Sequence, residues 1–163
     1  MKSSHKRKSE AQFYKPAREA LLDLFKPKDC YLEITADRRL PEKVKKVLTD
    51  YDLFANVVER FIPDITGYVL RSEHEKCVIV AEVKAGPTTL RDIFQTKQYA
   101  EIFGAKYAFL VSPEHMPEEI SRILRMKGTL LSHSAGYERV FIGRLDLNKN
   151  SIVQWQTDPP DLT

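Results

Sequence analysis

Two charged residues end a segment of the sequence that is otherwise apolar. Residues 77–81 have no polar side chain, which is typical of a strand covered on both faces of a sheet. Glu82 and Lys84 follow directly, and because side chains two apart on a strand share a face, both point the same way. Burying a carboxylate and an ammonium is costly unless they are paired or bound to a metal. The segment therefore predicts an internal ion pair or a metal site.

A predicted hairpin brings a second carboxylate to the same place. The run 61–70 is strand-like and contains one acid, Asp64, and the polar stretch 71–76 separates it from the first segment. In a hairpin centred on Glu73, Asp64 and Glu82 are equally far from the turn and lie opposite each other. Two carboxylates and the lysine would then meet on one rigid sheet, which is the outline of a divalent-metal site.

The order of these elements resembles the PD-(D/E)XK nuclease superfamily. Pro63-Asp64 precedes the hairpin, and Glu82-Val83-Lys84 ends its second strand. The helix expected next contains Gln95 and Tyr99, which are similar to the QxxxY element of the RecB-type branch. These elements lie within residues 57–112. The resemblance implies an α/β protein with a restriction-endonuclease-like core, in which α-helices flank a mixed central β-sheet.

The resemblance also implies a metal site. Phosphodiesters are anionic and resist an incoming hydroxide, whereas Mg²⁺ neutralises that charge and lowers the pKa of its water. Asp64, Glu82 and the backbone carbonyl of Val83 would hold Mg²⁺, with Mn²⁺ as a substitute. Relatives often add a glutamate from an early helix, and the sequence leaves four acids open for that position: Glu19, Glu33, Glu42 and Glu59.

The catalytic residues implied by the resemblance are Lys84, Gln95 and Tyr99. Lys84 would position or deprotonate the attacking water and offset charge in the transition state. Gln95 and Tyr99 lie four apart on one helical face and would orient the metal ligands or contact the scissile strand.

The function implied is a Mg²⁺-dependent deoxyribonuclease, with endonucleolytic cleavage in DNA repair, recombination or defence favoured. Two other classes stay open. One is a non-catalytic nucleic-acid-binding module with the same fold, and the other is a structural α/β protein whose charged trio is a salt bridge. The sequence does not distinguish duplex, flap, junction or single-stranded DNA from RNA as the substrate. It also leaves open whether cleavage is endo- or exonucleolytic, and whether the protein is a monomer or a homodimer.

The N-terminus is a candidate nucleic-acid contact. Lys2, Lys6, Arg7 and Lys8 lie among serines. We expect residues 1–12 to form a flexible basic arm, which either binds DNA phosphates or is only a solvated tail.

Length and composition predict a single domain. The chain has 163 residues, of which 42% are hydrophobic, and a net charge of +3. We expect one nuclease-like domain over residues 13–156 and a flexible tail over 157–163. Two cysteines without a C-x-x-C pair argue against a disulfide scaffold and suit the cytoplasm. No apolar run approaches ~18 residues, so we expect no membrane partner.

Local patterns predict the elements around the site. A helix beginning at Thr88 or Thr89 and ending at Gly104 would place Leu90, Ile93, Phe94 and Ala100 toward the core. The four histidines are expected at the surface. Three further helices are expected: one that begins at Pro16 and ends before Pro27, one that begins at Pro41, and one from Pro117 to Lys127. Strands are expected at 30–35, 54–60, 106–111, 140–145 and 151–155.

Overall fold

The structure of the protein is a computed structural model that describes residues 3–134, 138–156 and 158–162, with only the backbone described for residues 3–9. Its centre is an open sheet in the order β1-β2-β3-β4-β6-β5, with β7 paired to β6. β1, β2 and β3 are antiparallel, whereas β3, β4 and β6 are parallel. The strands are β1 Cys30–Ile34, β2 Ile65–Leu70, β3 Lys76–Val83, β4 Tyr107–Ser112, β5 Ser132–His133, β6 Glu138–Asp146 and β7 Ser151–Val153.

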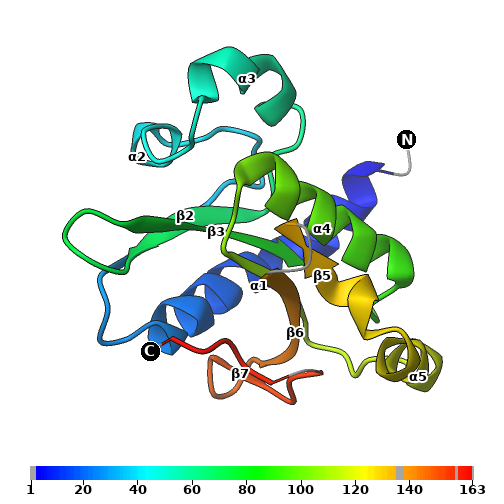
Figure 1. Ribbon diagram of the computed structural model, residues 1–163. Helices are drawn as coiled ribbons and strands as arrows, with labels where there is room; N and C mark the ends of the chain where they lie inside the picture. Colours follow the sequence, from blue (N-terminus) through cyan, green and yellow to red (C-terminus); the bar gives the residue numbers. More distant parts are fainter. Residues whose placement is uncertain (1–2, 135–137, 157, 163) are drawn as a thin grey trace.

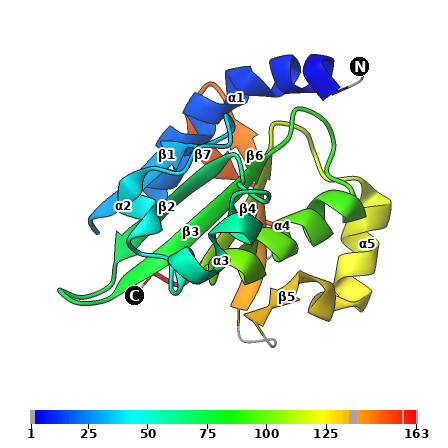
Figure 2. The same ribbon diagram turned by 90° about the horizontal axis from the view of Figure 1, so that it is seen from above.

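Helices lie on both faces of this mixed sheet, so the chain is an α/β protein as predicted. Figures 1 and 2 show α1 on one face and α4 on the other. The helices are α1 Ser3–Leu24, α2 Glu42–Lys45, α3 Tyr51–Val58, α4 Leu90–Phe103 and α5 Glu118–Met126, followed by the 3₁₀ helix Gly128–Leu131. None of the described helices has the length and apolar character that a membrane span needs.

β3 is buried on both faces, as its apolar sequence predicts. Val78 and Val80 belong to the hydrophobic core that includes α4. Ile79 and Ala81 point the other way, into the core that includes α1. The alternation of side chains along the strand thus fills two cores from one continuous apolar run.

The hairpin between β2 and β3 has the predicted register. Ile65 faces Ala81 at one end of the ladder, and Leu70 faces Lys76 at the other. Both pairs are symmetric about Glu73, which confirms the predicted centre. The same symmetry aligns Asp64, directly before β2, with Glu82 near the end of β3.

Local signals also define α4. The Thr89 side chain accepts a hydrogen bond from the backbone N–H of Asp92, whose carboxylate accepts one from Thr89 in return. Gly104 ends the helix with a φ of 59°, a conformation that glycine adopts readily. The predicted helix is confirmed at both ends, but the expectation that Phe94 faces the core is wrong, because its side chain is exposed.

The strand expected at 54–60 is wrong, since α3 occupies this region. Leu53, Phe54, Val57 and Val58 have the i, i+3, i+4 spacing of an amphipathic helix, and Val58 is the one of them that is buried. The helix expected from Pro41 is confirmed as a short one, because α2 ends at Lys45.

The N-terminal helix differs from the expected flexible arm. α1 begins at Ser3 and contains Pro16 in its interior. An interior proline costs ~3 kcal/mol, and burial of Ala17 and Leu21 on this helix offsets it. Lys2 and the side chains of Lys6, Arg7 and Lys8 lie outside the described residues, so the structure says nothing of the predicted phosphate contacts.

One residue of the expected C-terminal tail, Leu162, packs against the core that includes α1. His133 was expected at the surface but is buried, with 3% of its surface exposed.

Candidate functional site

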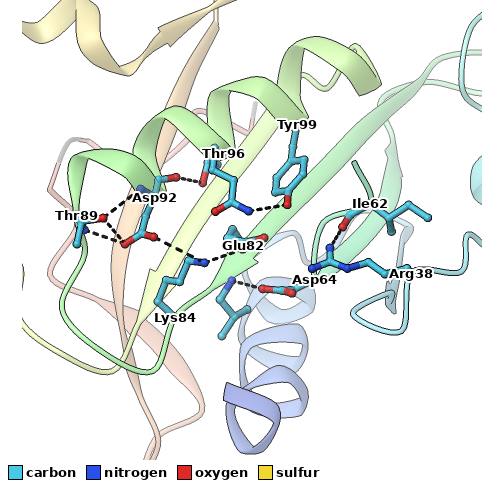
Figure 3. Close-up of polar contacts among 11 residues, drawn as sticks. Arg38, Ile62, Asp64, Glu82, Lys84, Thr89, Asp92, Thr96 and Tyr99 are labelled. Atoms are coloured by element: carbon cyan, nitrogen blue, oxygen red, sulfur yellow. Dashed lines mark hydrogen bonds and ion pairs between the residues drawn. The ribbon is translucent and has the colours of Figure 1, made fainter. Parts of the chain in front are cut away.

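The fold buries Asp64 and Glu82 together at one end of the β2–β3 hairpin, each with 3% of its surface exposed. The Val83 backbone N–H donates to Asp64 Oδ2 over 2.9 Å. The carbonyl of Asp64 accepts a 2.7 Å hydrogen bond from the backbone N–H of Thr35 beyond β1. The carboxylate of Asp64 is therefore held by β3 and its backbone by the residue that follows β1, and Figure 3 shows the carboxylate facing the same space as Glu82.

Lys84 joins these strands to α4. Its Nζ lies 2.8 Å from Glu82 Oε1 and 3.7 Å from Asp92 Oδ1. Asp92 is itself held, because its Oδ2 accepts hydrogen bonds from the N–H and hydroxyl of Thr89, each 2.9 Å long. The helix cap thus places a buried carboxylate beside the lysine (Figure 3). Sequence reasoning treated Asp92 only as a first-turn acid of the helix and missed this contact.

One carboxylate oxygen at the site lacks a partner. Glu82 Oε2 is buried and has no hydrogen bond within the described part of the protein. A buried, unpartnered acceptor is rare and points to a water or an ion that satisfies it. This oxygen is the strongest local sign that Glu82 binds something beyond Lys84.

The electrostatics of the two acids also favour a cation. Burial, and then the nearby Glu82 carboxylate, raise the pKa of Asp64 to about 8, although the Val83 N–H, Lys84 and Arg38 act in the opposite direction. Two carboxylates buried in one site repel until a proton or a cation neutralises one of them. A divalent cation would displace the proton and allow Asp64 to ionise.

Lys84 stays charged in this setting. Its burial favours the neutral amine, but the Glu82 carboxylate with its hydrogen bond, and then Asp92, raise the pKa of Lys84. The lysine is therefore a fixed positive charge at neutral pH. Of the two roles expected for it, positioning and charge stabilisation are favoured over taking a proton from water.

These groups line an open cleft of about 590 Å³. The residues around it include acids, bases and polar groups from five parts of the chain: Glu10, Tyr14, Arg38, Asp64, Glu82, Lys84, Gly86, Pro87, Thr89, Arg91, Asp92 and Gln95. Arg38 is oriented by donating from Nη1 to the carbonyl of Ile62. The cleft thus contains three cationic side chains and four acids, so an anionic ligand is favoured when a metal cation binds with it.

Gln95 and Tyr99 both lie near the acids. Gln95 lines the cleft, and its Nε2 donates to the Tyr99 hydroxyl over 2.7 Å. Burial, and then the Glu82 carboxylate, raise the pKa of Tyr99. The structure thus brings the predicted helix residues to the side of the carboxylate site.

The four acids considered for the metal shell lie elsewhere. Glu42 pairs with Lys45, and Glu59 accepts from the Tyr51 hydroxyl. Neither these nor Glu19 and Glu33 line the cleft.

A further acid, Glu10, also lines the cleft. It comes from an early helix, is 8% exposed and lines the cleft with Asp64 and Glu82. The sequence analysis missed Glu10 because it assigned this residue to the flexible arm. If the helix had been predicted to begin before residue 10 instead of at Pro16, Glu10 would have fallen one turn before Tyr14, on the same face of the helix.

The donor set fits a hard divalent cation. Asp64 and Glu82 provide carboxylate oxygens, one of them unpartnered, and Mg²⁺ and Mn²⁺ prefer such oxygen ligands. Within the described ranges, no group of three or more histidine, cysteine or acidic residues is arranged to hold a metal. The fit therefore depends on two carboxylates with additional oxygen ligands from backbone, water or substrate, as Mg²⁺ sites commonly have.

Comparisons with protein-family models, with curated proteins and with solved structures find no match to this chain. Its function is therefore argued from the geometry of the cleft.

Proposed function

We propose that this protein is a metal-dependent deoxyribonuclease of the PD-(D/E)XK type, with a restriction-endonuclease-like core. The observation that carries the proposal is the buried pair of Asp64 and Glu82, with Lys84 at 2.8 Å from Glu82. A catalytic cluster of this kind retains charge in a site where packing alone would favour apolar side chains.

The two carboxylates would hold Mg²⁺ or Mn²⁺ together with the backbone carbonyl of Val83. When bound, the cation would offset the charge of the phosphodiester and make a bound water more acidic. The Val83 N–H keeps Asp64 in position, so the ligand geometry is fixed before the substrate arrives.

The other cleft residues act on the substrate. Lys84 remains protonated and donates hydrogen bonds to the attacking water or to the phosphate, which stabilises the charge that develops in the transition state. Arg38 and Arg91 line the same cleft and suit binding of the flanking phosphates. Gln95, hydrogen-bonded to Tyr99, orients a ligand oxygen or the scissile strand.

A cleavage screen tests the proposal. Plasmid, single-stranded, flap and junction DNA are incubated with the protein and Mg²⁺ or Mn²⁺, with and without EDTA. We expect metal-dependent cleavage of at least one substrate by the wild type and background cleavage by Glu82→Gln. The matched control is Glu75→Gln on the same hairpin, where the glutamate side chain is 54% exposed. The proposal would be contradicted if the wild type cleaved none of these substrates, or if Glu82→Gln kept full activity.

One observation favours a second candidate, a non-catalytic α/β protein with an internal salt bridge. Lys84 already neutralises Glu82 at 2.8 Å and has Asp92 nearby, so the trio could act only in folding. In that case replacing Glu82 and Lys84 together by apolar residues should be neutral or stabilising, and no divalent cation should bind to the wild type.

A further inference from the structure

An exposed aromatic side chain lies on α4 beside the cleft. The Phe94 side chain is 49% exposed, whereas Ile93, Tyr99 and Phe103 on the same helix are buried in the core. Phe94 therefore contributes little to packing of the helix on the sheet. Single exposed apolar side chains are common on protein surfaces, so the case for Phe94 depends on the residues around it.

The surroundings of Phe94 are polar and cationic. The Lys97 Nζ lies 5.7 Å from the centroid of the Phe94 ring. A hollow of about 540 Å³ adjoins the ring and is lined by Arg91, Phe94, Gln95 and Gln98. It therefore combines an aromatic ring, a guanidinium and two amides, and no carboxylate is among these lining residues.

The hollow adjoins the candidate active site. Arg91 and Gln95 line both the hollow and the cleft that contains Asp64 and Glu82. Because both cavities share these two residues of α4, a nucleic-acid strand bound at the carboxylates would lie close to Phe94.

We propose that the hollow binds an unpaired nucleotide next to the bond that is cut, with its base stacked on Phe94. This inference rests on the proposed nuclease function and specifies its substrate. Arg91 and Lys97 provide positive charge for the phosphates, and the amides of Gln95 and Gln98 can bond to base edges. A base can stack on a protein ring only when it is unstacked from its own duplex neighbours. The substrate is therefore DNA with a single-stranded segment, such as a flap or a free end, rather than continuous duplex.

The chain offers a matched control for Phe94. Phe54 on α3 is 51% exposed, so it has nearly the same accessibility, but it lines neither the hollow nor the cleft. Any non-specific effect of removing a surface phenylalanine should appear equally in Phe54→Ala and Phe94→Ala.

Binding is measured by fluorescence anisotropy in EDTA, where no metal-dependent cleavage can occur. The ligands are a single-stranded oligonucleotide and a blunt duplex of the same length. We expect Phe94→Ala to weaken single-strand binding roughly 5- to 150-fold, since stacking contributes about 1–3 kcal/mol per base. Duplex binding should change less than about twofold, Phe54→Ala should match the wild type, and Phe94→Trp should restore single-strand affinity.

A second measurement locates the base. The single strand contains 2-aminopurine, whose fluorescence falls when it stacks on an aromatic ring. We expect quenching at one nucleotide with the wild type and its loss with Phe94→Leu, a variant that keeps an apolar side chain and so covers the case in which Phe94→Ala does not fold.

The inference would be overturned if the wild type did not bind the single strand, if Phe94→Ala lost equal affinity for duplex and single strand, or if Phe54→Ala and Phe94→Ala lost equal affinity. Unchanged nucleic-acid binding by Phe94→Ala would indicate a protein contact instead and would also overturn it. Failure of the nuclease proposal is distinct, because it would appear as absent metal-dependent cleavage while the binding assay in EDTA does not depend on cleavage.

Discussion

The two ends of the β2–β3 hairpin both carry an acid–base pair, but in opposite environments. At the turn, Arg71 Nη1 lies 3.6 Å from Glu75 Oε1, and the side chains are 51% and 54% exposed. At the other end, Lys84 Nζ lies 2.8 Å from Glu82 Oε1, and the side chains are 12% and 3% exposed. The same two strands thus present a solvated pair and a buried one.

The difference in burial suggests different roles: the exposed pair is an ordinary surface ion pair, whereas the buried charges are suited to binding a ligand. An exposed pair such as Arg71 and Glu75 contributes about 0–1 kcal/mol. The buried end contains an additional acid, Asp64, whose pKa is raised to about 8 by burial and then by the Glu82 carboxylate. It also contains the unpartnered Glu82 Oε2. A buried group of acids that is incompletely neutralised by the protein is suited to a cation from solution.

The largest expected effect comes from removing the buried acids. Asp64→Asn and Glu82→Gln should each reduce metal-dependent cleavage to background, because the cation loses a charged ligand. Glu75→Gln at the turn should keep wild-type activity. Initial cleavage rates are measured together with circular dichroism, and a folded Asp64→Asn or Glu82→Gln variant with full activity would refute the assignment.

The next largest effect is expected at Lys84, where a substitution should reduce the cleavage rate but not the affinity for metal or DNA. Lys84→Ala leaves both metal ligands but removes the fixed positive charge, so cleavage should fall by ~10²-fold or more. Metal and DNA affinity should stay within about an order of magnitude. Arg71→Ala at the turn should change neither rate nor affinity. If Lys84→Ala unfolds, the lysine is a structural ion-pair partner, and the comparison between the two ends loses its catalytic meaning.

A smaller effect is expected in the pH dependence of metal binding. Because the pKa of Asp64 is raised to about 8, a proton must leave when a cation binds. Mn²⁺ affinity should therefore increase by about tenfold per pH unit below that value and level off above it. Calorimetry in buffers with different ionisation enthalpies counts the released proton. An affinity that does not change between pH 6 and 8 would show that Asp64 is already ionised.

The smallest expected effect is on the stability of the metal-free protein. The pKa of Asp64 is raised from 3.8 to about 8 on folding, so the folded state binds the proton more tightly. Its contribution to stability is fully present below pH ~4 and is lost as the pH rises through 8. Chemical denaturation should show a decline on the order of 1 kcal/mol or more over this range. In Asp64→Asn, the free energy of unfolding should decline less with pH. If the pH profile of this variant matches that of the wild type, other groups cause the decline.

Local signals were sufficient for the centre of the site. A short polar turn between two apolar runs defines the hairpin register, and that register alone aligns Asp64 with Glu82. Thr89 and Gly104 similarly define the ends of α4. These features depend on neighbours in the sequence and so can be predicted from it.

The remaining residues of the cleft depend on contacts between distant segments. Glu10 reaches the site only because α1 extends before Pro16, and interior proline is disfavoured by local rules. Asp92 faces Lys84 because the helix packs on the sheet, which its capping role does not reveal. Phe94 has an apolar side chain at a plausible core position, and only the packing of α4 shows that it points outward.

The proposed function requires that a divalent cation binds at the buried end of the hairpin. The most direct measurement is calorimetric titration of Mn²⁺ into the wild type, Glu82→Gln and Glu75→Gln at one pH above 8. We predict one site per chain that Glu82→Gln abolishes and Glu75→Gln leaves unchanged. Absence of binding to the wild type, or equal binding by all three proteins, would contradict the proposed function.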